Sequence, residues 1–223
     1  MSGRDAPRHV IFDLDGTLVD SCAVCVDILS DILVERGSQH VIDRVYARSL
    51  MSRGGLEMVA GLLGSACVDS DADLAEFRAR YRKRQTSIET LFPGVSDGLK
   101  DIRDAGFILS VCSNKPQDLC EKVLEDTGLA NHFSLVVGGR PELRPKPASD
   151  LLDTVLAGLG AAAAECLFVG DSELDYQIAQ DAGIPFLFMS YGYAAKDWAP
   201  EVSTTFHCFQ NLTDMIVSHR AHA

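Results

Sequence analysis

Carboxylates, a hydroxyl, an amide and an amine stand in four short polar segments of this 223-residue chain. In chain order they are Asp13, Asp15 and Gly16, then Ser113 and Asn114, then Lys146, and finally Asp171 and Asp175. Several carboxylates at one place repel one another unless a cation offsets their charge, and Mg²⁺ prefers carboxylate oxygens together with water and phosphate oxygens. Amines, hydroxyls and the N–H groups of a glycine-containing loop bind phosphoryl groups. These residue types therefore indicate phosphate chemistry at a magnesium site.

The pair Asp13 and Asp15 suggests two catalytic roles. Asp13 ends an apolar run and could attack phosphorus, while Asp15, two residues on, could protonate the departing oxygen and later activate water. Ordinary structural interpretations compete with this one: an Asp-rich loop is often a capped turn, and residues 170–172 could be a helix N-cap. We favour the chemical interpretation because the segments follow successive strands, in an order that lets them meet.

Predicted strands and helices alternate along the chain. Short apolar runs, too short for helices, are separated by segments of helical periodicity. The runs are residues 10–12, 107–112, 135–137, 166–169 and 185–189. This alternation predicts an α/β fold with a doubly wound, mostly parallel five-stranded sheet. Ligands bind such sheets beyond the carboxyl ends of the strands, where the polar segments stand.

Residues 20–91 do not follow this alternation. Their apolar positions have helical periodicity, and no convincing strand interrupts them. We therefore expect residues 20–91 to form a separate all-helical domain, inserted into an α/β core made of residues 1–19 and 92–223.

The polar segments resemble the four sequence signatures of the haloacid dehalogenase superfamily. Residues 12–21, 111–115, 146–147 and 170–175 are similar to the first, second, third and fourth signatures, in order and with similar spacing. The helical insertion resembles the cap domain of the phosphoglycolate phosphatase group within that superfamily.

This resemblance implies roles for individual residues. Asp13 would form an aspartyl-phosphate intermediate, and Asp15 would be the general acid and base. The phosphate-binding residues that the resemblance implies are Gly16, Ser113, Asn114 and Lys146. The Mg²⁺ ligands that it implies are the side chains of Asp13 and Asp171 and the backbone carbonyl of Asp15, with Asp175 in support.

Two basic features of residues 20–91 are candidates for substrate contacts. Arg53 precedes two glycines and could place a cation and backbone amides over the active site, although a plain turn between helices explains the same residues equally well. Residues 78–84 concentrate five basic residues in an acidic protein. Most charge runs are solvated helix faces, and the alternative is steering of anionic substrates.

Composition limits the compartment and the partners. With 47% hydrophobic and 23% charged residues the chain falls in the ordinary globular range, no apolar stretch is long enough for a membrane span, and residues 1–10 lack the apolar run of a signal peptide. The net charge of −12 opposes binding to nucleic acid or acidic membranes. Seven cysteines suit a reducing compartment, so we expect a cytoplasmic protein. Cys22 and Cys25 form a CxxC without a second pair, which favours a packed helix face over a metal or redox site.

Together these observations predict a magnesium-dependent phosphatase that acts on a small phosphorylated metabolite, with 2-phosphoglycolate favoured by the resemblance. A phosphosugar mutase would keep the same core, with a sugar hydroxyl in place of water. A non-hydrolytic phosphate-binding protein is the other alternative, and it would be expected to lack Asp13, Asp15 or Asp171, all of which are present. The sequence predicts no oligomeric state.

Overall fold

The computed structural model describes residues 7–200 and 205–221. Within these ranges six parallel strands form one sheet in the order β3-β2-β1-β4-β5-β6. They are β1 (His9–Phe12), β2 (Ile108–Pro116), β3 (Leu135–Gly139), β4 (Cys166–Gly170), β5 (Phe186–Met189) and β6 (Thr205–Phe206). The predicted α/β class with a doubly wound parallel sheet is confirmed. The first six residues, on which the expectation of no signal peptide partly rests, lie outside the described ranges.

The sheet has one strand more than the five expected. β6 pairs with β5 at the edge of the sheet, with Thr205 opposite Phe188 and Phe206 opposite Met189. A strand of two residues has no periodicity of its own, so it could not be predicted from the sequence.

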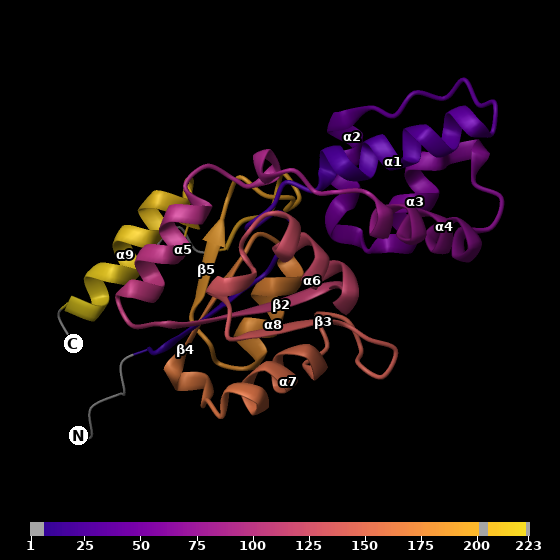
Figure 1. Ribbon diagram of the computed structural model, residues 1–223. Helices are drawn as coiled ribbons and strands as arrows, with labels where there is room; N and C mark the ends of the chain where they lie inside the picture. Colours follow the sequence, from indigo (N-terminus) through magenta and orange to yellow (C-terminus); the bar gives the residue numbers. More distant parts are fainter. Residues whose placement is uncertain (1–6, 201–204, 222–223) are drawn as a thin grey trace.

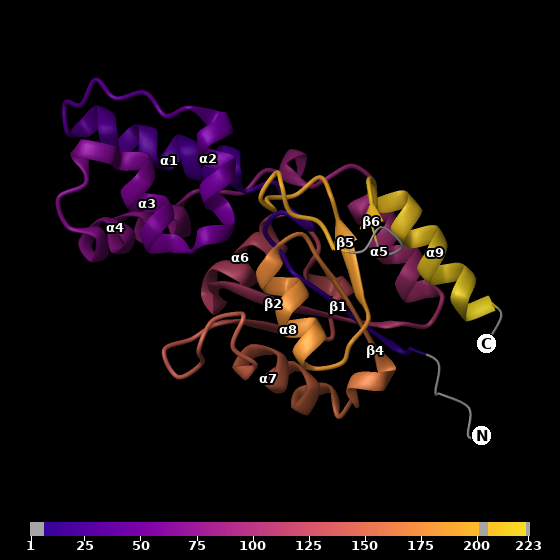
Figure 2. The ribbon, with the colours of Figure 1, turned by 180° about the vertical axis from the view of Figure 1, so that it is seen from behind.

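Helices cover both faces of the sheet (Figures 1 and 2). One face packs against α5 (Val95–Asp104), α6 (Gln117–Asp126) and α9 (Phe209–Ala221), and the other against α7 (Asp150–Leu159) and α8 (Glu173–Asp181). In β1, Val10 and Phe12 face the first set of helices, while Ile11 faces the second. Burial on both faces explains why the strands are continuous apolar runs.

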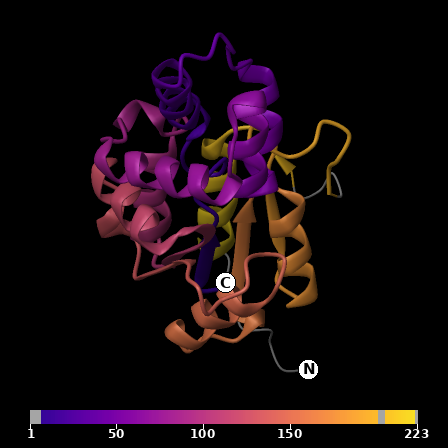
Figure 3. The same cartoon turned by 90° about the vertical axis from the view of Figure 1, so that its right-hand side faces the viewer.

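Between β1 and β2 the chain forms a helical insertion. Its helices are α1 (Cys22–Glu35), α2 (Arg44–Leu50), α3 (Gly55–Leu63) and α4 (Ser70–Lys83). They pack against one another, and α4 contacts α6. Figures 1 and 3 show the insertion at the end of the molecule opposite the two termini. None of the helices in the described part of the chain is long and apolar enough to cross a membrane.

The CxxC motif lies in α1. Cys22 and Cys25 are buried free thiols within the main hydrophobic core cluster. Cys25 shares its helix face with Ile28, Leu29 and Ile32, the spacing of an amphipathic helix. The interpretation as a packed helix face is confirmed.

Candidate active site

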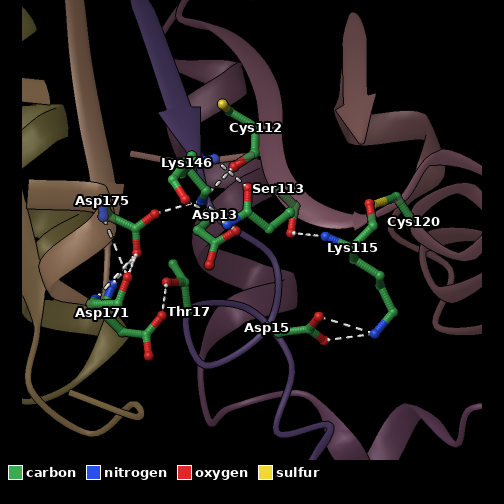
Figure 4. A network of polar contacts seen from close by, with 12 residues as sticks. Asp13, Asp15, Thr17, Cys112, Ser113, Lys115, Cys120, Lys146, Asp171 and Asp175 are labelled. Carbon is green, nitrogen blue, oxygen red and sulfur yellow. Dashed lines mark hydrogen bonds and ion pairs between the residues drawn. The ribbon is translucent and has the colours of Figure 1, made fainter. Parts of the chain in front are cut away.

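The polar segments meet at the carboxyl ends of the central strands, where the strand order reverses. Asp13 directly follows β1, and Asp171 directly follows β4, a neighbour of β1. Ser113 stands near the end of β2, the other neighbour. Because parallel strands end at the same edge, these side chains lie together in the crevice where doubly wound sheets bind ligands. Lys146 joins them from the loop between β3 and α7 (Figure 4).

A buried ion cluster occupies this crevice. The Lys146 ammonium lies 3.0 Å from Asp13 Oδ1 and 2.5 Å from Asp175 Oδ1. It also donates to the carbonyl of Cys112 at 2.9 Å. Lys146, Asp13 and Asp175 are all buried. The ammonium is therefore fixed beside Asp13 before any ligand arrives.

The charges in this cluster do not balance. Burial raises the pKa of Asp13 to about 6, although Lys146 beside it acts in the opposite direction. Burial, reinforced by the charges of Asp175 and Asp13, raises the pKa of Asp171 well above its usual value. Burial alone would lower the pKa of Lys146, but Asp13 and Asp175 raise it above its usual value, so the amine stays charged. The cluster thus contains one ammonium, paired with Asp13 and Asp175, and three carboxylates.

This excess of negative charge, on hard oxygen ligands, fits a divalent cation. Carboxylate oxygens of Asp13, Asp171 and Asp175 lie within 4.8 Å of one another. Both oxygens of Asp175 are already engaged, Oδ1 with Lys146, and Oδ2 with Ser172 Oγ at 2.6 Å and with two backbone N–H groups. Asp175 Oδ2 thus accepts from three donors, whereas each oxygen of Asp171 accepts from one, so Asp13 and Asp171 are the side chains better able to bind a metal, while Asp175 holds their surroundings in place.

Asp171 is oriented by two hydrogen bonds and by a close glycine. Thr17 Oγ1 donates to Asp171 Oδ1 at 3.0 Å, and the backbone N–H of Tyr193 donates to Oδ2 at 2.6 Å. Gly16 has a φ of +85°, and a Cβ there would lie 2.2 Å from Asp171 Oδ2, so only glycine fits. The N–H of Gly16 donates to the carbonyl of Val19 at 2.9 Å and is therefore used within its own loop.

Asn114 holds the backbone of Lys146. Its Nδ2 donates to the Lys146 carbonyl at 3.2 Å, and the Lys146 N–H donates to its Oδ1 at 2.7 Å. The neighbouring Ser113 is 2% exposed, and its hydroxyl oxygen accepts a long hydrogen bond of 3.4 Å from the N–H of Lys115. Asn114 is thus a support for Lys146, while Ser113 keeps its hydroxyl proton for a ligand.

Asp15 pairs with Lys115, a residue that residue type and spacing alone do not single out. Lys115 Nζ lies 3.0 Å from both carboxylate oxygens of Asp15. In Figure 4 the Asp15 carboxylate points to Lys115 rather than to Asp13. Burial opposes a charge on Lys115, but Asp15 and other neighbours raise its pKa well above the usual value. The sequence feature that could have indicated this contact is the position of Lys115 just after the apolar run 107–112.

A cavity of about 140 Å³ opens onto these groups. Asp13, Ser113 and Lys146 lie on its core side, and the helical insertion closes the other side with Gly54, Gly55 and side chains of α4. Ligand pockets in proteins commonly measure about 300–1,000 Å³. This cavity therefore suits a small molecule.

Arg53, a candidate substrate contact for which a plain turn between helices was the equal alternative, does not line this cavity. It forms an ion pair with Glu57 at 2.9 Å, and both side chains are 56% exposed. Residues four apart are neighbours on a helical surface, which explains the pairing. Arg53 lines a neighbouring groove instead. The glycines that follow it, Gly54 and Gly55, do line the cavity.

Comparisons with known proteins agree with this geometry. The pattern of the haloacid dehalogenase-like hydrolases matches residues 10–189, the region that contains all the polar segments. A phosphoglycolate phosphatase from Rhodobacter capsulatus is 34% identical over 217 residues, covering 93% of this chain and 95% of its own length. Another from Rhodospirillum rubrum is 36% identical over 198 residues, covering 85% and 82%. The solved structure of a predicted phosphoglycolate phosphatase from Haemophilus somnus 129pt has the same fold, with a TM-score of 0.81 at 24% identity over 96% of this chain and 99% of that chain.

Proposed function

The chain belongs to the haloacid dehalogenase-like hydrolase family and is a phosphatase of that family, and from this premise we propose that it hydrolyses a small phosphomonoester through a phosphorylated Asp13. The observation that carries the proposal is the convergence of Asp13, Lys146 and Asp171 on one small buried cavity. A nucleophile, a fixed cation and a carboxylate pair suited to a metal supply the groups that phosphoryl transfer requires.

In the first half-reaction a carboxylate oxygen of Asp13 attacks phosphorus. The bond between phosphorus and the ester oxygen breaks, and Asp15 gives a proton to the departing alcohol. Lys146 and Ser113 bind the phosphoryl oxygens. Because Asp175 already holds the Lys146 ammonium, little reorganisation is needed when charge develops on the phosphoryl group.

In the second half-reaction water attacks the phosphorus of phosphorylated Asp13. Asp15, now ionised, accepts a proton from that water, the bond between phosphorus and Asp13 breaks, and inorganic phosphate leaves. The Asp15 carboxylate faces Lys115 in the structure, so rotation of its side chain brings it to the reacting oxygen. The contact with Lys115 keeps Asp15 beside the cavity, and Asp15 is ionised there after it has given its proton to the departing alcohol.

Mg²⁺ is the cofactor that these residues fit. The side chains of Asp13 and Asp171 and the backbone carbonyl of Asp15 would hold it. When bound, a divalent cation offsets the repulsion between carboxylates and phosphate and stabilises charge on the phosphoryl oxygens. Asp175 supports this arrangement through the hydrogen bond from the Asp171 N–H to its Oδ2 and through its ion pair with Lys146.

We assign residues 20–91 to a cap domain over a core of residues 1–19 and 92–223. The two connections between them lie side by side, because the Asp20 N–H donates to the Thr90 carbonyl at 2.7 Å and the Phe92 N–H donates to the Leu18 carbonyl at 3.1 Å. With the insertion closing one side of the cavity, the cap limits the access of water during the first half-reaction.

2-Phosphoglycolate is the first candidate substrate. The relatives from Rhodobacter capsulatus and Rhodospirillum rubrum are phosphoglycolate phosphatases. The cavity of about 140 Å³ suits a small phosphorylated metabolite of this kind. Seven free cysteines are in keeping with a reducing compartment such as the cytoplasm.

The test is phosphate release from a panel of phosphomonoesters that includes 2-phosphoglycolate, hexose phosphates and an aryl phosphate, with Mg²⁺ and with a chelator. We expect magnesium-dependent release, fastest from 2-phosphoglycolate, and none from the Asp13→Asn variant. Conversion of a hexose phosphate to its isomer would point to a mutase. Undiminished turnover by Asp13→Asn would contradict the assignment of the nucleophile.

A further inference from the structure

One face of α4 forms part of the cavity wall. Its residues there are Leu74, Phe77, Arg78 and Tyr81, which recur at the spacing of a single helix face. Leu74, Phe77 and Tyr81 are buried, and Arg78 is half-buried. The guanidinium of Arg78 is thus the charged group that this otherwise mainly apolar face brings to the cavity.

The other arginines of the basic run 78–84 have partners elsewhere. Arg80 pairs with Glu35 and Glu76, Arg82 with Asp118, and Arg84 with Asp31 and Asp27. These ion pairs lie at the surface and fit the interpretation of the run as a solvated helix face. They leave Arg78 as an exception that this interpretation does not explain.

Arg78 makes no ion pair or hydrogen bond with any residue in 7–200 or 205–221. The acidic group whose charge acts on it is Asp118, and Asp118 Oδ2 is taken by Arg82 Nε at 2.5 Å. Partial burial, together with the charge of Arg82, lowers the pKa of Arg78, but a guanidinium remains charged at any physiological pH. A half-buried cation without a partner is costly unless a ligand supplies the opposite charge.

Arg78 lies next to the beginning of α3. A Cβ built on Gly55 would stand 3.7 Å from Arg78 Nη2, so the guanidinium lies close to the first residue of that helix. The first N–H groups of a helix have no partners within it and carry a partial positive charge. Gly54 precedes them with a φ of +90°, a backbone conformation that glycine adopts readily. The guanidinium and the helix terminus therefore favour an anion at the same place.

Tyr81, one helical turn from Arg78, adds a second unused donor. Its hydroxyl is buried and has no hydrogen-bond partner of standard geometry within the described residues. Lys115 Nζ lies over its ring at 4.5 Å from the centre. Burial raises the pKa of Tyr81 to about 12, so the hydroxyl is protonated at neutral pH and can donate.

We propose that Arg78 and the first N–H groups of α3 bind a carboxylate of the substrate, at the end of the cavity opposite the phosphoryl site. This inference rests on the proposed function and names its substrate class: phosphomonoesters that carry a carboxylate a few bonds from phosphorus. A planar guanidinium matches a carboxylate in bidentate geometry. A cavity of about 140 Å³ leaves little room for a second, bulkier phosphate. Arg78 is thus a specificity-determining residue, the role that the sequence suggests for Arg53.

The test compares two substrates that differ only at the distal group. These are 2-phosphoglycolate and 2-hydroxyethyl phosphate, in which a neutral hydroxymethyl group replaces the carboxylate. We expect Arg78→Ala to raise KM for 2-phosphoglycolate about tenfold or more and to change kcat/KM for 2-hydroxyethyl phosphate by less than about twofold. Arg78→Lys should recover part of the loss. Arg80→Ala, on the outer face of the same helix, is the matched control and should leave the ratio between the substrates unchanged.

A second readout uses inhibitors of aryl phosphate turnover. Glycolate carries the carboxylate alone and inorganic phosphate the phosphoryl group alone, so Arg78→Ala should weaken inhibition by glycolate and leave inhibition by phosphate unchanged. Equal losses on both substrates, or unchanged inhibition by glycolate, would overturn the carboxylate site and leave the phosphatase intact. Failure of the unmodified protein to hydrolyse any phosphomonoester would instead overturn the proposed function, and this inference with it.

Discussion

Individual hydrogen bonds help to orient the carboxylates of the active site, and the bond from Thr17 to Asp171 can be tested directly. The Thr17 hydroxyl is buried and donates to Asp171 Oδ1. Thr17→Val keeps the shape of the side chain and removes this donor. Because partners of a metal ligand tune affinity, we expect the Mg²⁺ concentration for half-maximal activity to rise about tenfold, with kcat at saturating Mg²⁺ close to that of the unmodified protein.

Thr213→Val is the matched control for this measurement. Thr213 is also buried, and its hydroxyl donates to the Phe209 carbonyl within α9, away from the site. It should leave the Mg²⁺ requirement unchanged. The same requirement in Thr17→Val as in the control would contradict a metal site at Asp171.

The cysteines give a second prediction for individual residues. Burial raises the pKa of Cys25 and of Cys112 to about 12, while Cys208 is exposed. Thiolates react and buried thiols do not, so a water-soluble maleimide should label Cys208 in the folded protein and Cys25 only after denaturation. Peptide mapping by mass spectrometry distinguishes these sites. Rapid labelling of Cys25 would show that the CxxC motif is accessible and is more than a packed helix face.

Local sequence fixes some of these residues better than others. Asp13 and Asp171 directly follow short apolar strands, so their place at the carboxyl ends of the strands could be predicted from the sequence. Arg78 could not be assigned in the same way. Helical periodicity shows that it shares a face with Phe77 and Tyr81, but what that face meets depends on how the insertion packs on the core.

A polar network joins the helical insertion to the loop after β5. The Tyr193 hydroxyl donates to Asp20 Oδ1 at 2.7 Å and accepts from the Cys22 N–H at 3.1 Å. Arg48 of α2 pairs with Asp20 at 2.9 Å and lies 4.9 Å from the centre of the Tyr193 ring. Since the backbone N–H of Tyr193 also holds Asp171, the same residue contacts the insertion and the metal site.

Tyr193→Phe should therefore destabilise the protein without removing the contact to Asp171. Losing the hydroxyl removes its hydrogen bonds with Asp20 and with the Cys22 N–H, and we expect the free energy of unfolding to fall by about 1–2 kcal/mol. Urea denaturation followed by circular dichroism measures this change. Tyr46→Phe, at a half-exposed position of α2, is the control and should have no effect. Equal stability of the two variants would show that the network contributes nothing measurable.

The elements also differ in how much of them could be predicted. β1, β4 and β5 were predictable because each is a short apolar run buried on both faces. β6 was not, since two residues at the sheet edge pair through the backbone and require no particular side chains. The helical nature of the insertion could be predicted from its periodicity, but its orientation over the cavity is set by tertiary contacts such as those between α4 and α6.

At the scale of the whole molecule, the buried carboxylates make stability depend on pH and on metal. Burial raises the pKa of Asp13 from 3.8 to about 6 and that of Asp171 well above 3.8. At pH values between the ordinary pKa of 3.8 and the raised pKa values, the folded chain binds more protons than the unfolded chain. The contribution of these two carboxyl groups to stability therefore falls as pH rises from about 4 to 6 and above. Mg²⁺ relieves this repulsion only where the carboxylates are ionised.

We therefore expect Mg²⁺ to raise the melting temperature more at about pH 7.5 than at about pH 5, where protons compete with the metal. Differential scanning calorimetry with Mg²⁺ and with a chelator gives the Mg²⁺-induced increase in melting temperature at each pH. Asp171→Asn should abolish the difference between the increases at the two pH values. A shift that is equal at both pH values, or one retained in Asp171→Asn, would show that Mg²⁺ binds elsewhere.

The proposed mechanism requires Asp13 to become covalently phosphorylated, and direct detection of that adduct is its most decisive test. With an activated aryl phosphate as substrate, the aryloxide leaves without a proton from Asp15, whereas hydrolysis of phosphorylated Asp13 needs Asp15 as the base, so Asp15→Asn should accumulate the intermediate. Acid quenching followed by peptide mass spectrometry should find one phosphoryl group on Asp13, and none when Asp13→Asn is added. A phosphoryl group on another residue, or turnover that continues without Asp13, would contradict Asp13 as the nucleophile.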